Sequence, residues 1–217
     1  MNYHRQHVRN VGVGVGLADS PQTMNLIHTR GAAEVIWRRQ PAPNFQDWID
    51  NLDPACLPRA RVVVQPHAVH DVVSLICGSA GIPGGGQRDV LVDDIAALAG
   101  VFADLMATPF LRLRLDVVND NACSKFHIDA VTARLVCTYR GTGTQYGIST
   151  DGSEPKRVFT VPTGAPIILR GTLWPDPPLC GLLHRSPPIE GTGTTRLVLV
   201  LDPADDPQAG TPSAGLN

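Results

Sequence analysis

The pattern of apolar residues changes once along this chain, near residue 109, and this change limits the folds that the chain can adopt. From Phe110 onward, "FLRLRLDVV" alternates apolar with charged residues, the period of two expected of a half-buried β-strand. Further candidate strands are "VTARLVCTYR", "QYGIS", "RVFTV", "APIILRG", "CGLLHRS" and "TTRLVLVLD". The loops between them are rich in Gly, Pro, Asp and Thr. Seven or eight short strands without intervening helices predict a β-barrel or a sandwich.

Before residue 109, apolar residues recur at intervals of three and four, which predicts helices. The candidate segments are "GAAEVIWRRQ", "NFQDWIDNL", "PHAVHDVVSLICGSAG" and "RDVLVDDIAALAGVFADLMA". We therefore expect an α+β chain whose N-terminal helices pack on a β unit. The predicted regions are a mobile N-terminal segment (1–25), a helical region packed on the barrel (26–108), a β-barrel core (109–203) and a mobile tail (204–217).

Composition narrows the class of protein. The chain has 217 residues, 43% of them hydrophobic, which is enough for a substantial core. The formal charge of -2 and the lack of a basic run argue against nucleic acid as a partner. There is no apolar run of membrane-spanning length, residues 1–20 lack the apolar core expected of a signal peptide, and the five cysteines form no CxxC pair. We expect a cytoplasmic protein whose partner is a small-molecule substrate or a metal ion, with its oligomeric state left open.

The segment "CSKFHIDAV", residues 123–131, contains a candidate metal site. In an extended strand, His127 and Asp129 project to the same face with Cα atoms about 6.6 Å apart, so that one cation can bind both. Both residues have the parity of Leu135 and Tyr139, so if the strand is continuous they face the barrel interior with these residues. The other histidine of the β region is His184, in "GLLHRSPP". Together, these residues predict two imidazoles and one carboxylate on a single metal ion.

Several segments together resemble a known family. The run "LRLRLDVVNDNACSKFHIDAVTARLVCTYRGTGTQY", with "EVIWRR", "GLLHRSPP" and "RLVLVLD", is similar to an uncharacterised bacterial family, domain of unknown function 1826. Members of this family are often encoded in zinc-responsive gene neighbourhoods beside metal-chaperone GTPases. The resemblance therefore implies a role in metal biology without identifying the metal.

A second resemblance concerns the ligand pattern. The order H-x-D, distant H and following R is similar to that of Fe(II)- and 2-oxoglutarate-dependent oxygenases. This resemblance implies a double-stranded β-helix, a cupin-like jelly-roll barrel, behind the N-terminal helices. It also implies that His127, Asp129 and His184 bind Fe(II), while Arg196 pairs with the far carboxylate of 2-oxoglutarate. The protein would then be a non-haem dioxygenase that oxidises an unknown substrate.

Further residues have more than one interpretation. Arg196 is either the partner of a cosubstrate carboxylate or an ordinary arginine in a salt bridge at the surface. Arg134, Tyr139 and Arg185 are reserve candidates for contacts with cosubstrate or substrate. Cys123 is either a buried free cysteine or, if "DNACSK" forms a turn, a fourth ligand.

The ligand set leaves two alternatives to an oxygenase. With Cys123 as a fourth ligand, the residues would form a closed zinc site in a non-catalytic protein that stores, delivers or senses zinc. A metal-dependent hydrolase with a zinc-bound water is the other alternative, although no further carboxylate is singled out as its general base.

Overall fold

The computed structural model describes residues 14–121, 123–149, 153–176 and 181–206. In chain order, its strands are β1 (Gly14–Ala18), β2 (Ala32–Trp37), β3 (Ala60–Val64), β4 (Phe110–Val118), β5 (Ala133–Arg140), β6 (Gln145–Ile148), β7 (Val158–Thr160), β8 (Pro166–Arg170), β9 (Leu182–Arg185) and β10 (Arg196–Ala204). Its α-helices are α1 (Phe45–Asn51), α2 (Val69–Ser79) and α3 (Gln87–Met106), and short 3-10 helices span Pro21–His28, Pro54–Cys56 and Pro66–Ala68.

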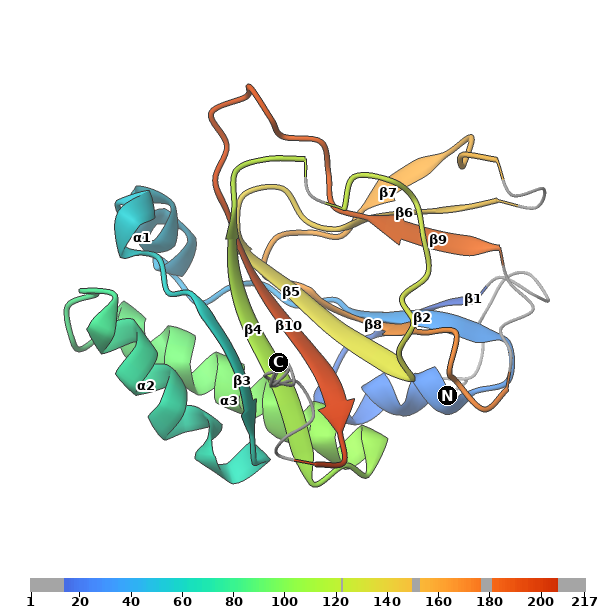
Figure 1. The fold of residues 1–217 in the computed structure, drawn as a ribbon, viewed down its shortest axis with the longest axis horizontal. Coiled ribbons are helices and arrows are strands. Elements are labelled where there is room, and N and C mark those ends of the chain that lie inside the picture. The colour runs from blue at the N-terminus through green and yellow to red at the C-terminus, as the bar shows by residue number, and fades with distance from the viewer. Residues whose placement is uncertain (1–13, 122, 150–152, 177–180, 207–217) are drawn as a thin grey trace, which may run out of the picture.

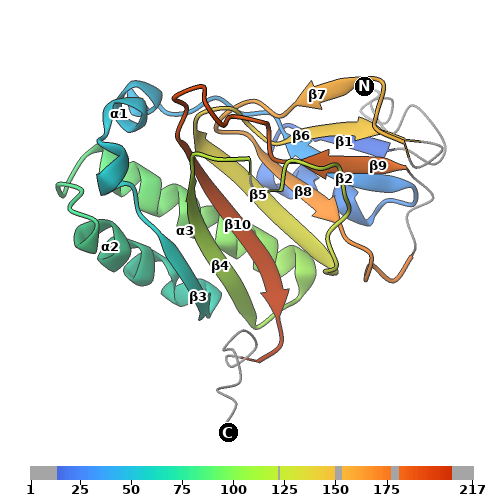
Figure 2. The same cartoon turned by 45° about the horizontal axis from the view of Figure 1, so that its top comes forward.

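These strands form two sheets that lie in layers. The large sheet has seven strands in the order β1-β2-β8-β5-β10-β4-β3, and the small sheet has three in the order β7-β6-β9 within the described residues. Strands β1 and β2 are parallel, and the other pairs are antiparallel. Helices α2 and α3 cover one face of the large sheet, and the small sheet lies over the other face (Figures 1 and 2). The protein is therefore a mixed helix and strand structure with a sheet at its centre.

The main core lies between the large sheet and the helices. Helix α3 contributes Leu91, Ile95 and Phe102, which pack with the buried residues that alternate along β4. Strand β10 is buried almost throughout, because its odd-numbered leucines join this core while Val198 and Val200 face the small sheet. Burial on both faces explains why "RLVLVL" is a nearly continuous apolar run.

The structure confirms the strands predicted from residue 110 onward as β4 to β10. Three of the four predicted helices are also present, as α1, α2 and α3. The prediction of a helix in "GAAEVIWRRQ" is wrong, because residues 32–37 form β2, an inner strand buried between β1 and β8. A short apolar run buried on both faces carries no periodicity that separates strand from helix, and its β-branched Val35 and Ile36 favour the strand.

The region before residue 109 therefore contains three strands as well as helices. Strand β1 lies in the segment expected to be mobile, and β3 forms the edge of the large sheet beside β4. No helix in the described parts of the chain combines the length and the apolar character needed to cross a bilayer.

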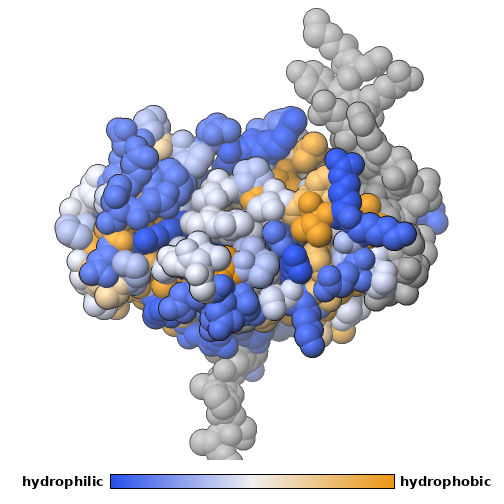
Figure 3. Space-filling view, turned by 90° about the horizontal axis from the view of Figure 1, so that it is seen from above, coloured by the Kyte–Doolittle hydropathy of each residue, from blue (hydrophilic) through white to orange (hydrophobic). Residues whose placement is uncertain are grey.

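The surface seen from above is mixed in character (Figure 3). Hydrophilic residues dominate its left side, over α1, while hydrophobic residues gather toward the right, over the three-stranded sheet. Ile148 and Val158 of that sheet are among the exposed large hydrophobic residues.

Candidate metal centre

Two segments that are distant in sequence bring His127 and His184 together. His127 lies in the connection between β4 and β5, where it forms an isolated antiparallel bridge with His184 of β9. The backbone N–H of each residue donates to the carbonyl oxygen of the other, at 3.0 Å in both directions. Residues directly opposite in an antiparallel pair project to the same face. The two imidazole rings accordingly lie with their centroids 4.6 Å apart.

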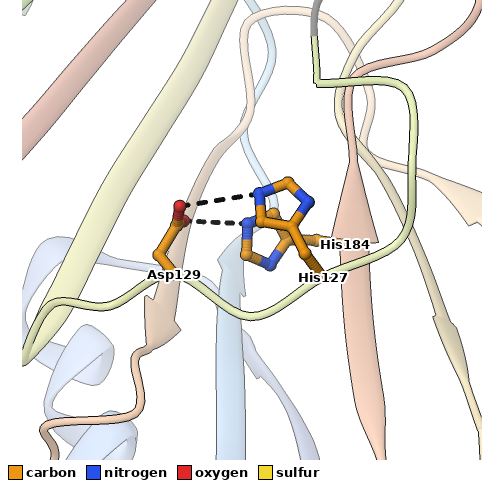
Figure 4. Close-up of side chains that lie close together, drawn as sticks. All are labelled: His127, Asp129 and His184. Atoms are coloured by element: carbon orange, nitrogen blue, oxygen red, sulfur yellow. Dashed lines mark hydrogen bonds and ion pairs between the residues drawn. The ribbon is translucent and has the colours of Figure 1, made fainter. Parts of the chain in front are cut away.

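Asp129 faces both rings (Figure 4). Its Oδ2 lies 2.9 Å from Nε2 of His184, and its Oδ1 lies 3.6 Å from Nε2 of His127. One ligand atom from each of the three residues lies within 4.8 Å of the others. Two imidazole nitrogens and one carboxylate oxygen at this spacing match the donors of a 2-His-1-carboxylate site.

The orientation of His127 suits a metal ligand. Its Nδ1 lies 2.8 Å from the carbonyl oxygen of Lys125, which can only accept a hydrogen bond, so this nitrogen carries a proton. In the neutral ring, Nε2 then has the free lone pair and lies toward Asp129. An outer hydrogen bond of this kind fixes the tautomer and the orientation of a metal-binding imidazole.

The backbone at Asp129 is held by the turn that follows β8. The N–H of Thr172 donates to the Asp129 carbonyl oxygen at 2.9 Å, and the N–H of Gly171 donates to the Thr132 carbonyl oxygen at the same distance. This approach requires a glycine, because a Cβ atom at residue 171 would lie 1.9 Å from the carbonyl oxygen of Val131. Gly171 therefore helps to position Asp129, the candidate carboxylate ligand.

Charged neighbours keep Asp129 ionised. Burial raises the pKa of Asp129, but the hydrogen bond from His184 and electrostatic interactions with His184, Arg134 and His127 outweigh it and lower the pKa to about 2. Arg134 donates to Asp129 and also to both carboxylate oxygens of Asp202, at 2.6 and 2.8 Å. An ionised carboxylate beside two imidazoles fits a divalent first-row metal ion.

A cavity of about 170 Å³ adjoins the three residues and is lined by all of them. Val136, Val198 and Val200 form an apolar part of its wall, and four arginines also line it. The strands β4, β5, β9 and β10 all contribute to the cavity, which lies on the face of the large sheet opposite the helices.

Arg196, at the start of β10, is buried beside this cavity. Its side chain is among the largest fully buried ones, with 1% exposure. Nε donates to the Thr142 carbonyl oxygen at 2.6 Å, and the terminal nitrogens lie 3.3 Å from the hydroxyl oxygens of Ser186 and Thr138. No carboxylate of the described residues pairs with it, and burial lowers its pKa to about 10. A buried cation without an anionic partner is costly, which makes this guanidinium a candidate for pairing with an anion.

Cys123 and Arg185 also line the cavity. Cys123 is exposed, and its carbonyl oxygen accepts a hydrogen bond from the N–H of Ser186. It lies outside the group of ligand atoms formed by the two histidines and the aspartate. Arg185 donates to Oε1 of Gln145 at 2.9 Å and stacks on the ring of Phe126.

The structure does not bring Tyr139 to this site. Tyr139 is buried in the core on the helical side of the large sheet, where its hydroxyl donates to Asp94 of α3 at 2.6 Å. Residues 127–139 do not form the continuous strand on which the parity argument depended, because β5 begins at Ala133. The odd-numbered residues of β5 face the helices, whereas Arg134 and Val136 face the cavity.

Three supporting residues were missed in the sequence: Gly171, Ser186 and Asp202. Asp202 is a charged residue at the end of a buried strand, a pattern that by itself suggests a partner such as Arg134. The roles of Gly171 and Ser186 depend on long-range contacts, which have no local signal in the sequence.

The match to a family model covers the whole of this site. Residues 18–202 match the model of a protein of unknown function, DUF1826. The chain belongs to this family. No curated protein matches the chain.

Solved structures with a similar fold include two plant enzymes. One is dioxygenase for auxin oxidation 1 from Arabidopsis thaliana, in a binary complex with 2-oxoglutarate. It is 12% identical, with a TM-score of 0.50 over 92% of this chain and 97% of that chain. The other is the dioxygenase for auxin oxidation in rice, which is 10% identical, with a TM-score of 0.51 over 88% of this chain and 84% of that chain. At these identities, the similarity establishes a shared fold and no more.

Proposed function

We propose that this protein is a mononuclear non-haem oxygenase that depends on Fe(II) and 2-oxoglutarate, built on a double-stranded β-helix. The observation that carries the proposal is a 2-His-1-carboxylate group and a buried, unpaired arginine on the walls of one cavity. The shared fold with two dioxygenases, one of them described as a complex with 2-oxoglutarate, also supports it.

In this proposal, Nε2 of His127, Nε2 of His184 and a carboxylate oxygen of Asp129 hold the metal. Bound Fe(II) and 2-oxoglutarate would supply the oxidising chemistry, in which the keto acid is decarboxylated and oxygen is activated. The Lys125 carbonyl orients the ring of His127, and Arg134, itself held by Asp202, orients Asp129. These outer contacts would hold the three side chains in the orientation needed to bind the metal.

Arg196 would pair with the far carboxylate of 2-oxoglutarate. The hydroxyl group of Ser186, which also lines the cavity, lies beside a terminal nitrogen of Arg196 and can donate to the same carboxylate. The valine side chains on the cavity wall exclude water from the reacting region, which strengthens the interaction of the guanidinium with an anion.

The ligand geometry favours an open iron centre over a closed zinc site. A structural zinc site needs four protein ligands, and the group formed by the described residues has three, with Cys123 outside it. Three protein ligands leave room for a bidentate keto acid and for oxygen, as the proposed reaction requires.

Anaerobic absorption spectroscopy tests the proposal. Addition of Fe(II) and then 2-oxoglutarate to the wild-type protein should produce the weak visible charge-transfer band of a chelated keto acid. H184A should lose the band, and R196Q should need a much higher 2-oxoglutarate concentration to produce it. Arg38→Gln, at an exposed salt bridge with Asp19, is the matched control and should behave as wild type. Lack of a band, with tight stoichiometric zinc binding lost in Cys123→Ala, would support the zinc alternative instead.

A further inference from the structure

The cavity beside the candidate metal centre contains a second cation without a close partner, Arg114. Its strand, β4, alternates between buried leucines that face the helices and residues that face the cavity side of the sheet. Arg114 pairs in register with Val200 of β10, which in turn pairs with Val136 of β5. Arg114 therefore lies next to the apolar part of the cavity wall, and like both valines it lines the cavity.

The charge of Arg114 is poorly compensated within the protein. In the described part of the chain, its ion pair is with Asp116, at 3.9 Å from Nη1, and Asp116 lies equally far from Arg61. Only 20% of the Arg114 side chain is exposed. Its Nε atom is buried and has no hydrogen-bond partner among the described residues. Arg134 in the same cavity differs, because it makes close contacts with two carboxylates. Burial, with the charge of Arg134, lowers the pKa of Arg114.

Arg114 and Arg196, which line the cavity, lack a close carboxylate partner among the described residues, so that the positive charge around the cavity can accommodate two anions. Its lining contains four arginines and two aspartates, of which Asp129 belongs to the metal ligands. Arg134 is paired with Asp129 and Asp202, and Arg185 is hydrogen-bonded to Gln145. If 2-oxoglutarate pairs with Arg196, the positive charge of Arg114 remains, together with an unsatisfied donor. Unsatisfied buried donors of this kind favour a ligand that accepts hydrogen bonds.

We propose that the substrate is a small organic acid whose carboxylate pairs with Arg114 while its apolar part lies against Val136, Val198 and Val200. The guanidinium supplies parallel N–H donors that fit the two oxygens of a carboxylate, and the valines bury the carbon skeleton. This inference rests on the proposed function for the reaction that follows binding. The binding of the acid depends on Arg114 and can be tested separately.

Calorimetric titration with matched pairs of probes tests the inference. Acetate, butyrate, benzoate and phenylacetate, each with its primary amide, are titrated into protein that contains Mn(II) and saturating 2-oxoglutarate. At least one acid should bind about tenfold more tightly than its amide, because the charged hydrogen bond is lost in the amide. Arg114→Gln should lose this preference, whereas Arg114→Lys should retain part of it. Arg61→Gln, at an exposed neighbour on β3, should change the affinity less than about threefold.

A second set of titrations, in the R196Q background without metal or 2-oxoglutarate, separates this inference from the proposed function. The preference for the acid should persist there, even if the protein proves not to bind 2-oxoglutarate at all. The inference is overturned if none of the acids binds, if they bind equally to Arg114→Gln, or if R196Q rather than Arg114→Gln abolishes the preference.

Discussion

Replacement of Arg196 by methionine should increase the stability of the ligand-free protein. Burial lowers the pKa of this guanidinium from its ordinary value to about 10, which corresponds to a cost of about 3 kcal/mol for the charged form in the folded state. Methionine removes that cost and fills a similar space. It also removes the hydrogen bond to the Thr142 carbonyl oxygen, a loss of about 1 kcal/mol. We expect a net gain of about 1 to 2 kcal/mol in the free energy of unfolding.

The same substitution should abolish the response to 2-oxoglutarate. A ligand at one hundred times its Kd stabilises the folded state by about 2.7 kcal/mol, so the wild-type protein should gain roughly this amount. Urea unfolding with Mn(II), with and without 2-oxoglutarate, measures both effects. Arg38→Met is the control, because its side chain is 48% exposed, and it should change stability by less than about 1 kcal/mol and retain the ligand response. The reasoning fails if Arg196→Met is less stable than wild type without ligand, or responds to 2-oxoglutarate as wild type does.

Three further predictions concern supporting residues. Gly171→Ala should weaken metal binding at least tenfold in a Mn(II) titration, because its Cβ would displace the backbone that carries Asp129. Gly100→Ala, in α3 with open space around its Cα, should leave metal binding unchanged. Asp202→Asn should destabilise the protein by roughly 3 kcal/mol in urea unfolding, because Arg134 loses a buried partner, and an unchanged stability would contradict this role. Glu34 is fully buried and has no hydrogen-bond partner among the residues that the structure describes, and burial raises its pKa well above 4.5. Between pH 4.5 and the pKa of Glu34 in the folded protein, Glu34 is ionised in the unfolded chain but protonated in the folded one. As the pH rises through this range, the free energy of unfolding of the wild type should therefore fall by about 1.4 kcal/mol per pH unit relative to that of Glu34→Gln. A difference in unfolding free energy that stays constant between about pH 5 and 7 would contradict this.

The β half of the fold could be predicted because its strands alternate or are bounded by turn residues. In β4, leucines and charged residues alternate along the strand, so that the leucines face one side of the sheet and the charged residues face the other. Strand β2 was missed because both of its faces are covered, so that burial leaves no period to detect. Strand β3 was also missed, since five residues at the edge of a sheet carry a weak signal.

The grouping of the candidate ligands was predicted correctly for a reason that was partly wrong. The parity of His127 and Asp129 with Tyr139 would place them in the barrel interior only if all three shared one continuous strand. In the structure, His127 and Asp129 lie outside β5, and the site forms because His127 bridges to His184 while the turn at Gly171 holds the Asp129 segment. Contacts between segments about 55 and 40 residues apart depend on the tertiary fold. Residue spacing alone therefore predicted the three candidate ligands but not the contacts that support them.

A crystal structure of the protein grown anaerobically with Mn(II) and 2-oxoglutarate tests the central claim most directly. The anomalous difference map should show a peak for the metal about 2.1 Å from Nε2 of His127, Nε2 of His184 and a carboxylate oxygen of Asp129. The far carboxylate of 2-oxoglutarate should lie against the guanidinium of Arg196. A metal bound to the sulfur of Cys123, or 2-oxoglutarate bound away from Arg196, would contradict the account.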